Sequence, residues 1–154
     1  MYVGDVMICA FFGHRSCPFA VEETLEEEIE KLLLSADVDT FYVGNKGAFD
    51  RFVQSALRNI KERYPYIKMF IVLDYIPTQK VEFEGFEIII PDSIENVPKR
   101  FIMSYRNKWM INECDVAIVY CVYTVGNTQR HVDMLKRKGK EIFNIADKIF
   151  EYKL

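Results

Sequence analysis

Apolar and polar residues alternate along this chain in blocks that predict strands followed by amphipathic helices. The run 5–12 is apolar after its first residue, which is typical of a central parallel strand covered on both faces. Over 22–35 the apolar side chains recur at helical spacing, and we expect a helix whose glutamates face water. A second pair follows at once, with a strand that begins at Thr40 and a helix that runs to Arg63.

The remainder of the chain repeats this order. We expect strands over 67–73, 86–90, 115–122 and 141–145, a helix over 99–113, and a helix from the Gly126–Thr128 turn to Gly139. Strands that alternate with helices predict βαβ units. The expected fold is therefore α/β and Rossmann-like, a doubly wound, mostly parallel sheet of about five to six strands with helices on both faces. No linker or internal repeat interrupts the pattern, so residues 1–154 are expected to form one domain.

Three loops carry the candidate chemistry. Right-handed crossovers require the strand order to reverse near the first strand, and ligands bind beyond the carboxyl ends of the strands at that reversal. Loops that begin at Gly13, Gly44 and Gly126 follow strands at this edge. The second contains Gly47 and opens a helix, whose free N–H groups and positive dipole end favour a phosphate or carboxylate. The same two glycines also suit a tight reversal of the chain without any ligand.

Together the loops have the composition of a nucleotide pocket. Arg15 offers a guanidinium for an anion, and Asp50 offers a carboxylate for a ribose hydroxyl. Surface exposure is the default for Arg106, but its helix leads into a neighbouring strand and could turn it toward the same edge. Neither the GxGxxG nor the Walker spacing occurs. The predicted ligand-binding residues are Gly13, His14, Arg15, Gly44, Gly47, Asp50, Arg106, Gly126, Asn127 and Thr128.

Composition excludes several classes of partner and site. With 20 basic against 23 acidic residues, the formal net charge is −3, and we expect no nucleic-acid partner. No apolar run approaches the roughly 20 residues of a membrane span, so no membrane partner is expected. The four cysteines lack CxxC pairing, which predicts reduced thiols and a cytoplasmic location. With only two histidines, no metal site is expected.

Four motifs in order carry a family resemblance: Phe12–Arg15, Val43–Asp50, Arg106–Asp115 and Gly126–Val132. Together they resemble the SLOG superfamily, which unites Smf/DprA-like and LOG-like domains, and within it the YpsA-like branch. The resemblance spans nearly the whole chain. It implies a Rossmann-like domain for nucleotides or nucleotide-derived ligands, which some relatives sense and others hydrolyse.

Two departures from the family pattern affect what can be transferred. Asn127 replaces the second glycine of the usual Gly-Gly-Thr turn, although asparagine tolerates left-handed backbone geometry. His131 stands where the LOG phosphoribohydrolases have their catalytic glutamate. The second departure argues against a direct transfer of that activity.

The leading hypothesis is a cytoplasmic sensor that binds a nucleotide or ADP-ribose-like ligand and requires no other cofactor. Arg15 and the helix near Gly47 would hold phosphate, Asp50 the ribose, and Gly126–Thr128 a second anionic group. An alternative is an N-glycosidic hydrolase of nucleoside monophosphates, for which Asp50 is the catalytic candidate, so that enzymatic activity stays open. A third is an oligomeric interaction module. Trp109 and its aromatic neighbours would supply an interface, and we expect a homodimer.

Overall fold

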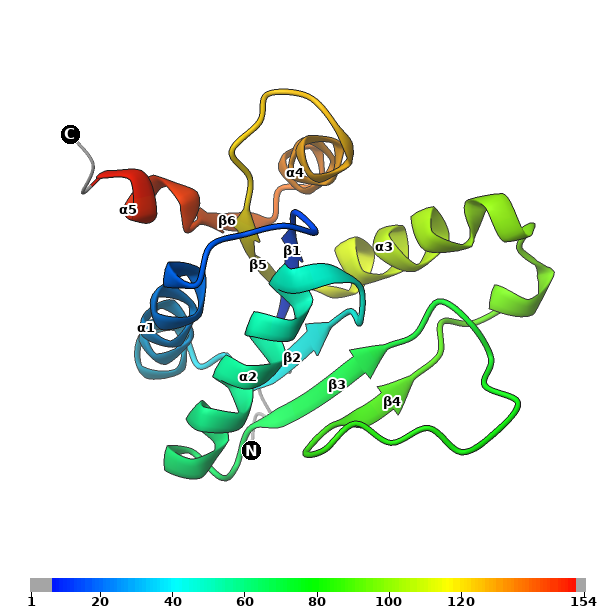
Figure 1. The fold of residues 1–154 in the computed structure, drawn as a ribbon, viewed down its shortest axis with the longest axis horizontal. Coiled ribbons are helices and arrows are strands. Elements are labelled where there is room, and N and C mark those ends of the chain that lie inside the picture. The colour runs from blue at the N-terminus through cyan, green and yellow to red at the C-terminus, as the bar shows by residue number, and fades with distance from the viewer. Residues whose placement is uncertain (1–6, 152–154) are drawn as a thin grey trace, which may run out of the picture.

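In the computed structural model, which describes residues 7–151, a six-stranded parallel sheet carries helices on both faces (Figure 1). The strands are β1 (Ile8–Gly13), β2 (Thr40–Val43), β3 (Lys68–Val72), β4 (Glu87–Ile89), β5 (Val116–Tyr120) and β6 (Glu141–Asn144). They lie in the order β4-β3-β2-β1-β5-β6, so the chain moves outward from β1 to β4 and then crosses back to the other side of β1. The predicted Rossmann-like α/β fold is confirmed.

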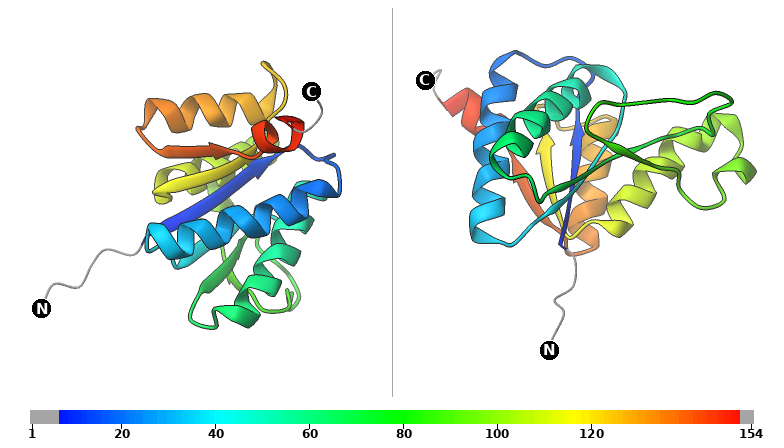
Figure 2. Two further views of the ribbon diagram at one scale, coloured as in Figure 1. Left: turned by 90° about the vertical axis from the view of Figure 1, so that its left-hand side faces the viewer. Right: turned by 90° about the horizontal axis from the view of Figure 1, so that it is seen from below.

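Helices cover both faces of the sheet (Figure 2). They are α1 (Ala20–Ser35), α2 (Gly47–Arg63), α3 (Ile102–Glu113), α4 (Asn127–Arg137) and α5 (Ala146–Glu151). On β1, Cys9 and Phe11 pack with α1 and α2, whereas Ala10 and Phe12 pack with α3 and α4. Because successive side chains of a strand point to opposite faces, a strand covered on both must be apolar throughout. This explains the continuous apolar run that predicted a central strand.

Element boundaries differ from expectation in a few places. Residues 5 and 6 of the first predicted strand lie outside the described residues. Two short 3₁₀ turns, η1 (Ile94–Asn96) and η2 (Lys99–Phe101), precede α3. Helical spacing in the sequence predicts one apolar side for this helix, with Phe101, Ile102, Tyr105 and Trp109. This prediction is wrong, because Phe101 is 51% exposed and the buried residues of α3 are Arg106, Met110 and Ile111. Figure 1 shows the reason: the first half of α3 projects past the sheet, where no second layer covers it.

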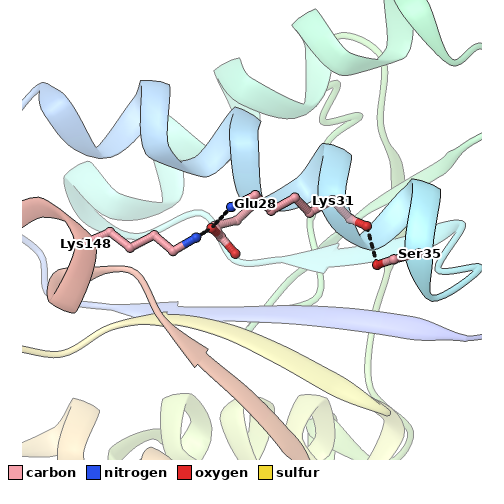
Figure 3. A network of polar contacts seen from close by, with 4 residues as sticks. All are labelled: Glu28, Lys31, Ser35 and Lys148. Atoms are coloured by element: carbon pink, nitrogen blue, oxygen red, sulfur yellow. Dashed lines mark hydrogen bonds and ion pairs between the residues drawn. The ribbon is translucent and has the colours of Figure 1, made fainter.

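One glutamate of α1 contradicts the expectation that these side chains face water. Glu28 is buried, and its Oε1 pairs with Lys148 of α5 and, at 3.3 Å, with the Nζ of Lys31 (Figure 3). The hydroxyl of Ser35 donates to the carbonyl of Lys31 on the same helix. A carboxylate is buried at acceptable cost only when it is paired. The pairing therefore fixes α5, a helix that the sequence pattern did not predict, against α1.

The strand register brings three loops to one edge of the sheet. Gly13, the last residue of β1, lies opposite Tyr120, the last residue of β5. On the other side of β1, the strand β2 ends at Val43 and is followed by Gly44. The loops after β5, β1 and β2 are thus neighbours in space although they are far apart in sequence.

Candidate site at the carboxyl edge of the sheet

The loops after β1 and β2 pack directly against each other. The amide of Ala48, near the start of α2, donates to the carbonyl of Arg15 at 2.7 Å. Gly47 has φ of +82°, and a Cβ at this position would lie 2.8 Å from the Cα of Arg15. The amide of Lys46 donates to Oδ2 of Asp50 at 2.9 Å. Two amides at the start of α2 are therefore already bonded within the chain and are not free for a phosphate.

The glycines at 13 and 44 make room for side chains of this chain. A Cβ at Gly13 would lie 2.3 Å from the ring of Phe49. A Cβ at Gly44 would lie 2.8 Å from Oδ2 of Asp50 and 3.1 Å from Nη1 of Arg106. The shortest distance at each position, 2.3 Å at Gly13 and 2.8 Å at Gly44, is far inside van der Waals contact, so a larger residue would force these neighbours to move. Packing within the chain therefore explains the glycines at positions 13 and 44 without a bound phosphate.

Behind the loops lies a buried polar cluster that connects α2, α3 and α4. Arg106 is only 4% exposed, and its Nη1 donates to Oδ1 of Asn45 at 3.4 Å. Its Nη2 donates to Oδ1 of Asn107 at 3.3 Å, and Nδ2 of Asn107 lies 3.4 Å from Nε2 of His131. Arg106, expected at the surface by default, is therefore buried close to Asp50 at the predicted edge.

The cluster shifts the proton affinities of its members. Burial raises the pKa of Asp50 to about 6, against the opposing effects of the Lys46 amide and the Arg106 guanidinium. Burial also lowers the pKa of Arg106, although Asp50 and Asp74 act in the opposite direction. The pKa of His131 falls to about 4, first through burial and then through the nearby cations Arg106 and Arg130. Asp50 thus ionises near neutral pH while His131 stays neutral.

The solvent side of the same edge combines aromatic and cationic side chains. The imidazole of His14 accepts a hydrogen bond from the amide of Val122 at 3.0 Å, and its ring centroid lies 4.8 Å from that of Tyr123. Tyr123 is 64% exposed. Arg15 follows on the surface, and Lys46 lies beyond it with its Nζ 3.7 Å from Oδ2 of Asp74. We call Tyr123, His14, Arg15 and Lys46 the edge row.

The third predicted group, Gly126–Thr128, lies at the end of the loop after β5, where α4 begins. Gly126 has φ of +110° and precedes α4, and the Nη1 of Arg130 donates to Oδ1 of Asn127 at 2.9 Å. Thr128 is buried. Over residues 7–151, no hydrogen bond or ion pair joins these three residues to the loops after β1 and β2. The structure therefore brings together seven predicted site residues, and their role in binding stays a prediction: Gly13, His14, Arg15, Gly44, Gly47, Asp50 and Arg106.

Neither a metal cluster nor a membrane span is present in the described part of the chain. Within residues 7–151 no group of three or more His, Cys, Asp or Glu side chains is placed to hold a metal ion. No helix in that range is long and apolar enough to cross a bilayer.

Comparison with known proteins places this fold among Rossmann-like proteins. No protein family and no curated protein matches the sequence. The structure of DNA processing protein A (DprA) from Streptococcus pneumoniae is similar with a TM-score of 0.65 and 17% identity, over 90% of this chain and 50% of that one. DNA processing protein A from Helicobacter pylori is similar with a TM-score of 0.59 and 11% identity, over 96% and 73%.

The chain thus spans half the length of the pneumococcal protein. Its structural neighbours are DprA proteins, which belong to the SLOG superfamily. The structure from Helicobacter pylori is described by its unique single-stranded DNA binding mode.

This comparison overturns two predictions made from the sequence. The expected small-molecule nucleotide ligand and the expected absence of a nucleic-acid partner are both wrong, since the neighbour binds single-stranded DNA. The physical reasons lie in the structure. Side chains fill the space at Gly13 and Gly44 that a phosphate turn would use, and a net charge summed over the chain does not describe one edge of the sheet. The expected homodimer stays a prediction.

Three residues of this edge were missed from the sequence. Tyr123 lies in the loop after β5 and is 64% exposed, and the available signal was its position just past a predicted strand at the ligand-bearing edge. Lys46 stands between Gly44 and Gly47, and the sequence pattern indicated a role for these two glycines only. Asp74 lies two residues after the end of β3 and is buried beside Lys46, a pairing that no local pattern indicates.

Proposed function

We propose that this chain binds single-stranded DNA across the carboxyl edge of its sheet, with the edge row as the contact surface. The proposal is carried by a row in which the Tyr123 ring contacts His14, His14 is followed by Arg15, and the loop that holds Lys46 packs on Arg15 through Gly47 and Ala48. It joins the ends of three neighbouring strands. The single-stranded DNA binding of the Helicobacter pylori neighbour supports the same class of partner.

The chemistry of the edge row matches what single strands require. Proteins that bind them combine aromatic rings, on which bases stack, with cations that follow the phosphates. The Tyr123 ring is exposed and is backed by the imidazole of His14, which is itself fixed by the amide of Val122. Arg15 offers a planar fork for a phosphate, and Lys46 supplies a second positive charge. One base and the phosphates beside it would be held in this way.

The same chemistry favours a single strand over a duplex. A ring such as that of Tyr123 stacks only on a base whose face is open, and in duplex DNA both faces of each base are already stacked. The edge row also presents one aromatic residue beside two cations, and neither a helix nor a β-ribbon projects from it into a groove. We therefore expect duplex DNA to bind less tightly.

Fluorescence anisotropy with a labelled oligo(dT) at low salt tests the proposal. Substitutions Tyr123→Ala and Arg15→Ala should each weaken binding about tenfold, the effect of losing one stacked base or one charge-assisted contact. Lys99→Ala removes an exposed cation of η2 that is not part of the edge row and serves as the control, with affinity expected to stay within about twofold.

Two results would refute this function. One is no measurable binding of the oligonucleotide by the wild-type protein at low salt. The other is a control variant that loses as much affinity as the two edge-row variants, since binding would then follow total charge. Thermal unfolding of each variant separates loss of contact from loss of fold.

We further propose that the resemblance within the SLOG superfamily extends to the YpsA-like branch, with the four ordered motifs as support. Superposition on a solved YpsA-like domain, with the four motifs at equivalent positions, would test this. A cytoplasmic location is supported by four free thiols and is checked by fractionation of the cells that produce the protein.

A further inference from the structure

A second surface gathers positive charge on the far side of the sheet. It is a groove of about 350 Å³ between α3 and α4, lined by Lys108, Asn112, Met134, Arg137 and Lys138. These residues lie in the C-terminal halves of the two helices or just after them, where the chain turns toward the amino ends of β5 and β6. The groove is therefore at the edge of the sheet opposite the edge row. We call it the cationic groove.

Its three cations have no partner in the part of the chain that the structure describes. Within residues 7–151, no ion pair involves Lys108, Arg137 or Lys138, and no hydrogen bond is made by their side chains. The amide side chain of Asn112 is likewise free of partners there. Like charges that line one groove repel one another unless an anion lies between them.

The simplest structural role for such cations, the capping of helix carbonyls, is already filled by other groups. Gly139 has φ of +70° and ends α4, so the amides of Lys138 and Gly139 donate to the carbonyls of Met134 and Lys136. For α3, the Nζ of Lys140 donates to the carbonyls of Asn112 and Cys114, at 3.3 and 2.6 Å. The side chains of the cationic groove are therefore not the groups that cap the carbonyls at the ends of α3 and α4.

We propose that the cationic groove binds phosphate groups. Three cations and one amide provide several N–H donors for phosphate oxygens, and Met134 gives the groove an apolar wall. The volume lies at the lower end of the roughly 300–1,000 Å³ found for small-ligand sites. The phosphates belong either to a free oligophosphate or to a nucleic-acid backbone that extends beyond the edge row. Only the second source rests on the proposed function.

Isothermal titration calorimetry with tripolyphosphate tests the site without any DNA. The double variant Lys108→Gln/Lys138→Gln should weaken binding about tenfold or more, since it removes two charge-assisted contacts. The matched control is Lys68→Gln/Lys99→Gln, which removes the same charge from exposed positions outside the groove and should change affinity less than twofold. Because this titration contains no DNA, its outcome does not depend on whether the edge row binds a strand.

Oligonucleotides of 5 and 30 nucleotides identify the source of the phosphates. If the groove variant weakens only the longer one, the groove holds a nucleic-acid backbone; if it weakens neither, yet weakens tripolyphosphate, the ligand is a free oligophosphate. The proposal is overturned if tripolyphosphate does not bind the wild type at low salt. It is also overturned if the groove and control variants lose the same affinity.

Discussion

At the scale of residues, the cluster around Arg106 holds two groups whose pKa values are shifted in opposite directions: that of Asp50 is raised and that of His131 is lowered. The folded protein keeps a proton on Asp50 up to a pKa of about 6, whereas an unfolded chain loses it near the ordinary value of 3.8. Between these pH values the folded state binds more protons, so this group makes stability fall as pH rises. His131 stays neutral down to a pKa of about 4 instead of 6.5, so its contribution to stability falls as pH drops. The two effects oppose each other between about pH 4 and 6.

Single substitutions should therefore reveal a pH dependence that the wild type largely conceals. Each group changes the free energy of unfolding by roughly 3 kcal/mol between its pKa values in the unfolded and folded states. We expect the stability of Asp50→Asn to rise between pH 4 and 6.5, and that of His131→Gln to fall between pH 4 and 6. Urea unfolding at several pH values, followed by the fluorescence of Trp109, the one tryptophan of the chain, measures this.

The wild type, measured in the same buffers, is the reference for both variants. Asn at position 50 keeps an acceptor for the Lys46 amide, so the comparison isolates the charge. Two variants with the same pH profile as the wild type would contradict the assignment.

At the scale of elements, an ion pair joins α5 to α1, beside the apolar contacts that Ala146 and Ile149 make with the core. Glu28 on α1 is buried and contacts Lys148 of α5, while its other partner, Lys31, is largely exposed. Removing Lys148 leaves the buried carboxylate of Glu28 with the exposed Lys31 as its partner, which compensates the charge less well. We expect Lys148→Met to reduce the free energy of unfolding by about 2 kcal/mol.

Chemical denaturation checks this value, and Lys80→Met is the control. Lys80 pairs with Glu82 at 2.9 Å, but both side chains are solvent-exposed, so its loss should cost at most about 0.5 kcal/mol. The double variant Glu28→Gln/Lys148→Met should recover part of the loss, because no buried charge remains. Equal losses for Lys148→Met and Lys80→Met would show that burial of Glu28 is unimportant.

At the scale of the whole molecule, a chain of net charge −3 must bind a polyanion through a local surface. Each phosphate contact with a single strand lowers the slope of log K against log salt concentration by about 0.7. We expect Arg15→Ala to reduce the magnitude of this slope by about that amount, and Tyr123→Ala to lower affinity without changing it. Titrations at four salt concentrations give the slopes. Identical slopes for wild type and Arg15→Ala would exclude Arg15 as a phosphate contact.

Much of this architecture follows from the sequence alone. The alternation of apolar runs with helical periodicity is local, so it indicated the order of strands and helices and the central place of β1. The glycines at the ends of β1 and β2, Gly13 and Gly44, correctly indicated the carboxyl edge of the sheet as the place where the loops meet. What they do there was misjudged from the sequence, because the space around a glycine depends on residues distant in the chain. Gly13 faces Phe49, and Gly44 faces Arg106.

The sequence by itself thus determined the fold class, the covered strands and the edge at which the loops meet, since each rests on short-range periodicity and on the handedness of crossovers. Only the tertiary structure decided that Arg106 is buried, that Glu28 pairs with Lys148, and that Tyr123 stands beside His14. These contacts join segments that lie far apart in the sequence. Which side chains meet there depends on strand order and helix packing, and no local pattern contains that information.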